Sequence, residues 1–294
     1  MIKDFINSPS LSIDNPWYNK YLKGLADLWF LSDLNGKGDL TTEFVSKKGV
    51  AKARIIAKEA GILCGSDEVK WLFENYPRFK GAQIKFLIKD RTKKGGIIAE
   101  LTGRYEVLMM VERLVLNILQ RMSGIATYTS ELDSKVSRYG VKVACTRKTY
   151  WGPLDKWACV AGGGASHRLG LWDAILIKEN HLRAGVGLDF SRVRNAKFID
   201  IEIEDLGQLG KALGELKAGK TPVIFMLDDF NIAKIPDAIK IIRGAGHHVE
   251  LSGGINSGNL VKYAKLKPDF ISMGCLTQDA SALDLSMELY QSAI

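Results

Sequence analysis

The chain has 294 residues, with 41 Lys and Arg against 33 Asp and Glu, and a formal net charge of +8 at pH 7. This length suits one large α/β barrel or two domains, and the positive charge favours acidic partners. No stretch approaches the roughly eighteen apolar residues of a membrane span, and no basic stripe is interleaved with aromatic residues. We therefore expect a soluble cytoplasmic protein that binds neither a membrane nor a nucleic acid.

The cysteine pattern indicates thiols rather than disulfides or a metal site. None of the four belongs to a C-x-x-C pair, and each lies in an apolar or strand-like run: Cys64, Cys145, Cys159 and Cys275. We expect them to be free, buried thiols in a reducing compartment.

The first part of the chain has short, mixed segments typical of a small α+β domain. A helix is predicted around Tyr18–Leu31, strand-like runs begin at Ala53 and Ala82, and KKGG at 93–96 predicts a turn into IIAELTGRYE. From Val107 to Met122 apolar residues recur with helical period, which predicts a long, buried helix. We place the domains at 1–112, 113–276 and 277–294, the last as a helix that packs back on the N-terminal domain.

Beyond the long helix, β-rich runs alternate with amphipathic stretches such as DLGQLGKALGEL and IAKIPDAIKIIRGAG. This alternation predicts βαβ units and a parallel sheet, and we favour a barrel over an open doubly wound sheet. The six runs are VKVACT from Val141, AILIK from Ala174, FIDIEI from Phe198, PVIFML from Pro222, HVELS from His248 and DFISMG from Asp269.

Polar residues and glycines stand at one end of these six runs. Because parallel barrels bind ligands at the carboxyl ends of their strands, this placement predicts a binding site there. In chain order the residues are Arg147 and Lys148, Lys178, Glu202, Asp228, Ser252-Gly253-Gly254 and Gly274.

The residue types predict a ligand with several negative charges. Arginine and lysine suit carboxylates and phosphates, and a glycine turn before a helix capped by Asn256 or Ser257 would cradle a phosphate. Two acids, Glu202 and Asp228, suit sugar hydroxyls or Mg²⁺. A phosphorylated sugar, a metal and a second anion would satisfy all of these residues. The cationic set comprises Arg147, Lys148, Arg168 and Lys178, together with His167.

Each feature also has a plain structural explanation. Arg147-Lys148 could be a solvated strand end, His167 a structural histidine in a loop, and the Gly162–Gly164 run a flexible linker. Glu202 could face solvent rather than the site, since it alternates with isoleucines. The shared position of these features at one sheet edge favours the functional interpretation.

The motifs resemble those of the quinolinate phosphoribosyltransferases, also called decarboxylating nicotinate-nucleotide pyrophosphorylases. The resemblance extends over nearly the whole chain, in the same order and spacing. It is carried by GKGDLTTE, ARIIAKEAGILCG, ERLVLNILQRMSGIAT, TRKT, GGG-x-x-HRLGL, LIKENH, the EIED region, MLDDF, ELSGGI and SMGCLTQ.

The resemblance implies an α/β fold with an N-terminal α/β sandwich and an incomplete, TIM-like barrel of about seven strands. It also implies a homodimer, with higher assembly left open, in which Arg113 completes the partner's site. The substrates would be quinolinate and phosphoribosyl pyrophosphate, with Mg²⁺ as cofactor. By resemblance, Arg147, His167 and Arg168 would hold quinolinate with Lys148 beside them, and Lys178 would face pyrophosphate. Glu202 and Asp228 would take the ribose hydroxyls and Mg²⁺, and Ser252, Gly253 and Gly274 would bind the 5′-phosphate. Gln278 stands where some family members carry His and others Gln, and is a further substrate-binding candidate.

One segment departs from the family pattern. After TRKT the family continues with a proline-glycine turn, whereas this chain has Tyr150-Trp151-Gly152-Pro153 and is about two residues shorter before Gly162. The change would either repack the rim of the site or alter which pyridine acid is accepted. Two other functions stay open: a related phosphoribosyltransferase of the molybdenum-transport type, and a barrel aldolase with a Schiff-base Lys148 or Lys178.

Overall fold

The computed structural model describes residues 3–45, 48–178, 181, 193, 195–216 and 221–290. The chain forms two compact units. The barrel unit comprises Met1–Pro9, Tyr128–Gly152 and Gly162–Asp279, and the N-terminal unit comprises Ser10–Thr127, Pro153–Ala161 and Ala280–Ile294. Their boundary falls within helix α5 (Tyr105–Val136), between Thr127 and Tyr128, and differs from the predicted division after residue 112.

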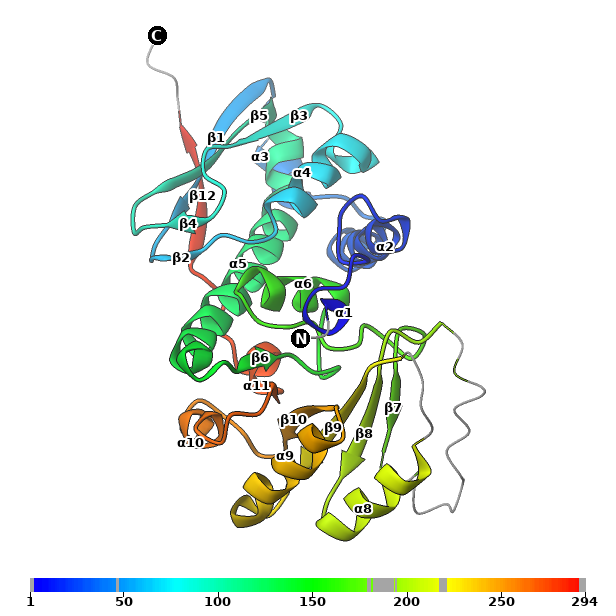
Figure 1. The fold of residues 1–294 in the computed structure, drawn as a ribbon. Coiled ribbons are helices and arrows are strands. Elements are labelled where there is room, and N and C mark those ends of the chain that lie inside the picture. Colours follow the sequence, from blue (N-terminus) through cyan, green and yellow to red (C-terminus); the bar gives the residue numbers. More distant parts are fainter. Residues whose placement is uncertain are drawn as a thin grey trace. The chain divides into compact units, whose positions relative to one another are not determined.

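The N-terminal unit is built around a four-stranded antiparallel sheet with the order β12-β1-β5-β3 (Figure 1). The predicted first helix is confirmed as α2, whose buried residues recur every four positions and therefore form one apolar face. The side chain of Asn15 accepts a hydrogen bond from the Trp17 N–H, which caps its first turn. The elements of the unit are α2 (Pro16–Leu34), α3 (Leu40–Val45), β1 (Val50–Ala57), β2 (Gly61–Ile62), α4 (Ser66–Asn75), η1 (Pro77–Phe79), β3 (Ala82–Phe86), β4 (Arg91–Thr92), β5 (Ile97–Arg104), α6 (Pro153–Ala161) and β12 (Leu285–Tyr290).

The C-terminal segment corrects the sequence prediction. We expected a helix over 277–294, but β12 is a strand that pairs with β1 in antiparallel register, from Leu285 opposite Ala57 to Tyr290 opposite Lys52. Leu285, Met287 and Leu289 alternate with polar residues, and this period of two suits a strand. The free edge of β1 supplies the hydrogen-bond partners, so the predicted helix was wrong.

The barrel unit contains all six predicted strands, in parallel pairs with the order β6-β11-β10-β9-β8-β7. The first strand therefore lies beside the last, as it does in a barrel, and among the described residues no strand pairing joins β6 to β7. Helices α8 and α9 lie along β8 and β10 (Figure 1). The elements are α1 (Lys3–Ile6), η2 (Ser137–Tyr139), β6 (Lys142–Ala144), β7 (Ile175–Ile177), β8 (Ile199–Ile203), α8 (Leu206–Glu215), β9 (Val223–Asp228), η4 (Ile232–Lys234), α9 (Ile235–Gly244), β10 (His248–Ser252), α10 (Leu260–Ala264), β11 (Phe270–Ser272) and α11 (Cys275–Gln278).

A short segment partly fills the seventh position of the barrel. Ala165 forms a parallel bridge with Ala144 on the edge of β6 that does not pair with β11, and its N–H and C=O bond to Val143 and Cys145. The backbone N–H groups of Ser166 and His167 then donate to the carbonyls of Ile6 and Phe5. The N-terminal helix thus anchors the segment that carries His167.

The side chain of Phe5 fills part of the apolar core of the barrel unit. Its ring is fully buried and lies 4.1 Å from the ring of Phe270 and 5.2 Å from that of Phe198, measured between centroids. Small residues such as Ala144 and Ala174 leave room for it. These apolar side chains fill one layer of the barrel interior. The polar side chains lie in the layers nearer the carboxyl ends of the strands.

Two further expectations concern the cysteines and membranes. All four cysteines are free, as predicted, and Cys64, Cys145 and Cys159 are buried. Cys275, which was also expected to be buried, is only half-buried. Among the helices of the described ranges, none combines the length and apolar content that crossing a bilayer requires.

Candidate active site

The carboxyl ends of the strands border a cavity of about 400 Å³ in the barrel unit. We call it the strand-end cavity. Six of the predicted site residues line it: Lys148, Asp228, Ser252, Gly253, Gly274 and Gln278, and the rest of its wall includes Thr146, Asp229, Gly254, Asn256, Ser272 and Asp279. The predicted convergence at one sheet edge is therefore present, because parallel strands end on the same side.

The glycine turn after β10 allows close packing against the end of β9. Gly253 has φ of 91° and Gly254 has φ of 57°, values that suit glycine. A Cβ at Gly253 would overlap the backbone nitrogen and side chain of Asp229. Asp229 itself has a positive φ of 45°, and its N–H donates to the Ser252 carbonyl at 3.2 Å. Backbone, rather than side chains, therefore forms this wall of the cavity.

The helix predicted to follow that turn begins later than expected. Helix α10 starts at Leu260, and its N-cap is Asn259 rather than Asn256 or Ser257. The N–H of Asn256 donates to the Asn259 side chain at 2.8 Å, and the N–H of Gly258 donates to the Asn256 side chain at 2.9 Å. Because asparagine side chains accept hydrogen bonds from these amides, the segment forms turns and the helix begins later. The backbone of the two glycines therefore remains the candidate for phosphate binding.

Glu202 faces the site rather than solvent. It is half-buried, and burial followed by the negative charge of Asp228 raises its pKa, while Lys178 opposes this rise. The three side chains therefore act on one another electrostatically at the ends of β7, β8 and β9. The oxygens of two carboxylates that repel each other are suitable ligands for a hard cation such as Mg²⁺.

Arg147 and Arg168 form a cationic pair. Arg168 is 6% exposed, and burial together with the positive charge of Arg147 lowers its pKa. Its Nη1 donates to the Ala174 carbonyl at 3.5 Å. Asp173 holds the intervening loop by accepting the Leu169 N–H at 2.7 Å. Two like charges held together by the fold provide a site for a carboxylate or a phosphate.

His167 lies deeper than the predicted substrate contact requires. Its ring is buried, and its Nε2 is 3.2 Å from Asp200 Oδ2 and 3.5 Å from Glu250 Oε1. Both carboxylates are fully buried, and apart from this ion pair their oxygens have no hydrogen-bond partner among the described residues. The ring therefore engages protein carboxylates, as a structural histidine would.

The charged form of His167 prevails in this cluster. The Arg168 N–H points at Nδ1 from 2.6 Å, which suits a neutral ring and contributes about 1 kcal/mol. Each nearby carboxylate contributes about 4 kcal/mol to the charged ring at an effective dielectric constant of about 20. Burial alone would lower the pKa of His167, but the charges of Glu250 and Asp200 outweigh it and raise the pKa to about 9.

Sequence reasoning missed Asp200 and Glu250 as members of the site, although a signal was present. Asp200 stands two residues before Glu202, and Glu250 stands two residues before Ser252. Side chains two apart on a strand point to the same face. Once Glu202 and Ser252 are placed inside the barrel, the two acids must lie inside as well.

The departing segment after TRKT ends at the point in the sequence where the chain passes from the barrel unit to the N-terminal unit. Gly152 has φ of 47°, Trp151 is half-buried and Tyr150 is exposed. Helix α6 begins at the next residue, Pro153, and belongs to the N-terminal unit. Which pyridine acid this segment admits stays a prediction.

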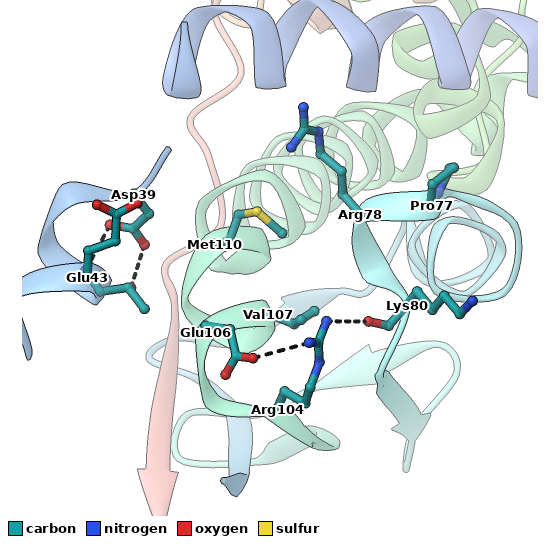
Figure 2. Close-up of a pocket in the computed structure, with 10 residues that line it drawn as sticks. Asp39, Glu43, Pro77, Arg78, Lys80, Arg104, Glu106, Val107 and Met110 are labelled. Carbon is teal, nitrogen blue, oxygen red and sulfur yellow. Dashed lines mark hydrogen bonds and ion pairs between the residues drawn. The ribbon is translucent and has the colours of Figure 1, made fainter. Parts of the chain in front are cut away.

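A second cavity of about 500 Å³ lies within the N-terminal unit and contains none of the predicted site residues (Figure 2). Arg104 bonds there to Glu106 at 3.3 Å and to the Lys80 carbonyl at 3.3 Å. Arg113 lies two turns further along α5 and is exposed. The N-terminal unit thus presents Arg113 at its surface.

Comparison with known proteins identifies the family. The quinolinate phosphoribosyl transferase N-terminal domain model matches residues 39–123, and the C-terminal domain model matches residues 125–288. The chain is 38% identical over 270 residues to a probable nicotinate-nucleotide pyrophosphorylase (carboxylating) of Methanocaldococcus jannaschii, covering 86% of this chain and 92% of that one. It is 35% identical over 280 residues to the similarly named protein of Bacillus subtilis, covering 91% and 93%.

Solved structures agree with this assignment. The structure of the nicotinate-nucleotide pyrophosphorylase from Francisella tularensis superposes with a TM-score of 0.82 at 33% identity, covering 92% of this chain and 97% of that chain. Both domain models match in order and together span most of the chain. The chain therefore belongs to the quinolinate phosphoribosyltransferase family.

Proposed function

We propose that the protein transfers a phosphoribosyl group from phosphoribosyl pyrophosphate to the ring nitrogen of quinolinate. The products are nicotinate mononucleotide, pyrophosphate and CO₂, in the biosynthesis of NAD. The gathering of cationic, acidic and glycine residues at the ends of six parallel strands, in a chain of this family, supports the proposal.

Arg147 and Arg168 would bind the two carboxylates of quinolinate. Quinolinate is a dianion and phosphoribosyl pyrophosphate carries further negative charge, so cations must offset their repulsion. The pair supports this role because the positive charge of Arg147 acts on Arg168 strongly enough to lower its pKa, so two positive charges lie close together. His167 would support this binding site from deeper in the barrel, because its Nε2 faces Asp200 and Glu250.

Phosphoribosyl pyrophosphate would occupy the strand-end cavity. Ser252, Gly253 and Gly274 would bind its 5′-phosphate, with Gln278 at the border of the same cavity. Lys148 and Lys178 would stabilise the departing pyrophosphate, and Glu202 and Asp228 would bind the ribose hydroxyls. The same two acids would hold Mg²⁺, which neutralises phosphate charge when bound.

The reaction needs no covalent nucleophile on the protein. The nitrogen lone pair forms a bond to the anomeric carbon while the bond to pyrophosphate breaks. The resulting pyridinium ring accepts the electron pair released when the bond between C2 and its carboxylate breaks, and C2 then takes a proton from solvent. The site contributes by positioning two anions and by stabilising the leaving group.

A homodimer would complete the site. Exposed Arg113 on α5 is available to a second copy of the chain, in keeping with the arginine expected to reach a partner's site. We place the enzyme in the cytoplasm, where its four free thiols stay reduced.

A direct assay tests the proposal. The protein is incubated with quinolinate, phosphoribosyl pyrophosphate and Mg²⁺, and nicotinate mononucleotide and CO₂ are measured, with nicotinate as the competing acid. We expect product from quinolinate and little from nicotinate, which has only one carboxylate for the two arginines. Absence of product from quinolinate would reject the proposed function.

A further inference from the structure

Lys148 is held by threonine hydroxyls on both sides of its backbone. Its N–H donates to Thr146 Oγ1 at 3.1 Å, and its carbonyl accepts a hydrogen bond from Thr277 Oγ1 at 2.7 Å. Thr146 is a local partner, two residues earlier. Thr277 is fully buried in α11 and far along the chain, so only the tertiary fold brings its hydroxyl to Lys148.

The side chain of Lys148 packs against the same short helix. A Cβ placed on Gly274 would lie 3.3 Å from Lys148 Cδ and 2.9 Å from Gln278 Oε1. The alkyl chain of the lysine therefore runs across Gly274, where the missing side chain leaves room for it. The Gly274 carbonyl in turn accepts the N–H of Thr277 at 3.2 Å, which ties the glycine to the threonine.

The sheet explains why these segments meet. Strands β6 and β11 are parallel neighbours, with Ala144 opposite Ser272. The chain leaves both strands at the same edge, so the segment that carries Lys148 and the first turn of α11 start side by side. The contact thus joins the first strand of the barrel to its last.

We propose that Thr277 is a positioning residue for Lys148. Its hydroxyl fixes the lysine backbone so that the alkyl chain lies across Gly274 and the lysine lines the strand-end cavity. The inference rests on the proposed function, in which Lys148 stabilises charge on phosphoribosyl pyrophosphate there. Gly274 accordingly serves Lys148 as well as the phosphate.

Matched variants separate positioning from packing. Thr277→Val keeps the shape and removes the hydroxyl, and Thr277→Ser keeps the hydroxyl. Thr129→Val is the control, because Thr129 is also fully buried in the barrel unit and its Oγ1 has no partner in the described part of the chain. Each variant is assayed for kcat, for both KM values and for its melting temperature.

We expect Thr277→Val to lower kcat/KM for phosphoribosyl pyrophosphate about ten-fold, since small misplacements of a catalytic group are costly. The KM for quinolinate should change much less. Thr277→Ser should stay close to the wild-type value, and Thr129→Val should change neither parameter. Wild-type kinetics in a folded Thr277→Val protein would overturn the inference, as would an equal loss in Thr277→Ser.

A double-mutant cycle with Lys148→Met gives the decisive test. The dissociation constant of phosphoribosyl pyrophosphate is measured by calorimetry in the wild type, in both single variants and in the double variant. If Thr277 acts through Lys148, Thr277→Val has no further effect once the ammonium is gone. If instead the effects of Thr277→Val and Lys148→Met on the dissociation constant add independently, the inference is refuted. The two hypotheses can fail separately. If the proposed function is wrong, the wild-type protein makes no product, while the binding cycle still measures the coupling between Thr277 and Lys148.

Discussion

Nε2 of His167 lies 3.2 Å from Oδ2 of Asp200, and both side chains are buried inside the barrel unit. Glu250 lies on the other side of the ring at 3.5 Å, and Arg168 follows in the chain. Burial and the negative charge of Glu250 also raise the pKa of Asp200 to about 7. A buried ion cluster of this kind must leave a trace in the pH dependence of stability.

His167 should make the protein less stable at alkaline pH. Because its folded pKa of about 9 exceeds the ordinary value of 6.5, its contribution is complete below pH 6.5 and is lost as the pH rises towards 9. A shift of this size corresponds to at most about 3 kcal/mol. We expect the melting temperature to fall more between about pH 6 and about pH 9 in the wild type than in the triple variant His167→Gln/Asp200→Asn/Glu250→Gln, which removes the histidine together with the two carboxylates that titrate beside it. Parallel curves for the two proteins would contradict the ion pair.

The arginine pair should select quinolinate. Arg147→Ala and Arg168→Ala should each raise the KM for quinolinate by at least about ten-fold, because each removes a charge-assisted bond to a carboxylate. The KM for phosphoribosyl pyrophosphate should change less. Arg138→Ala is the control, since Arg138 precedes β6 at the opposite end of the strand and contacts Tyr139. Equal losses for both substrates would argue against a carboxylate-specific role.

The turn at Gly253 should tolerate no side chain. Gly253→Ala combines an unfavourable positive φ with overlap on Asp229, so we expect the KM for phosphoribosyl pyrophosphate to rise more than about ten-fold. Gly246→Ala carries a similar φ of 83° but meets no atom within 4 Å. It should cost about 1 kcal/mol of stability and leave the kinetics unchanged. The comparison is read from initial rates and melting curves, and similar kinetics in the two variants would count against the crowded turn.

A buried ion pair should anchor α6 within the N-terminal unit. Arg121 donates two hydrogen bonds to the fully buried Asp155, at 2.8 and 2.7 Å. Arg121→Met removes the charged partner of a buried carboxylate and should destabilise the protein by about 3–5 kcal/mol. Adding Asp155→Leu should recover much of that loss. Thermal denaturation of the three proteins measures both effects. A double variant no more stable than Arg121→Met would show that lost packing, and not the loss of the charged partner, destabilises the protein.

Much of the barrel was predictable because strands and their ends have local signatures. The six β-rich runs became β6 to β11, and Lys148, Asp228 and Ser252 line one cavity as their positions in the sequence predicted. Parallel strands share a direction, so knowing where each strand ends is enough to predict which residues meet.

Contacts between distant segments were not predictable in this way. The predicted C-terminal helix is the strand β12, because the edge of β1 offers hydrogen-bond partners that no local pattern reveals. The boundary between the units likewise falls inside α5, whose helical pattern continues without a break.

The sequence by itself determined the fold class, the family motifs and the strand ends that carry the site, because these depend on periodicity and on residue type. The tertiary structure alone decided that His167 faces Asp200 and Glu250, and that Thr277 bonds to Lys148. Both outcomes depend on which side chains share the barrel interior. That is settled by the register between strands and by burial, and neither can be read from one segment of the chain.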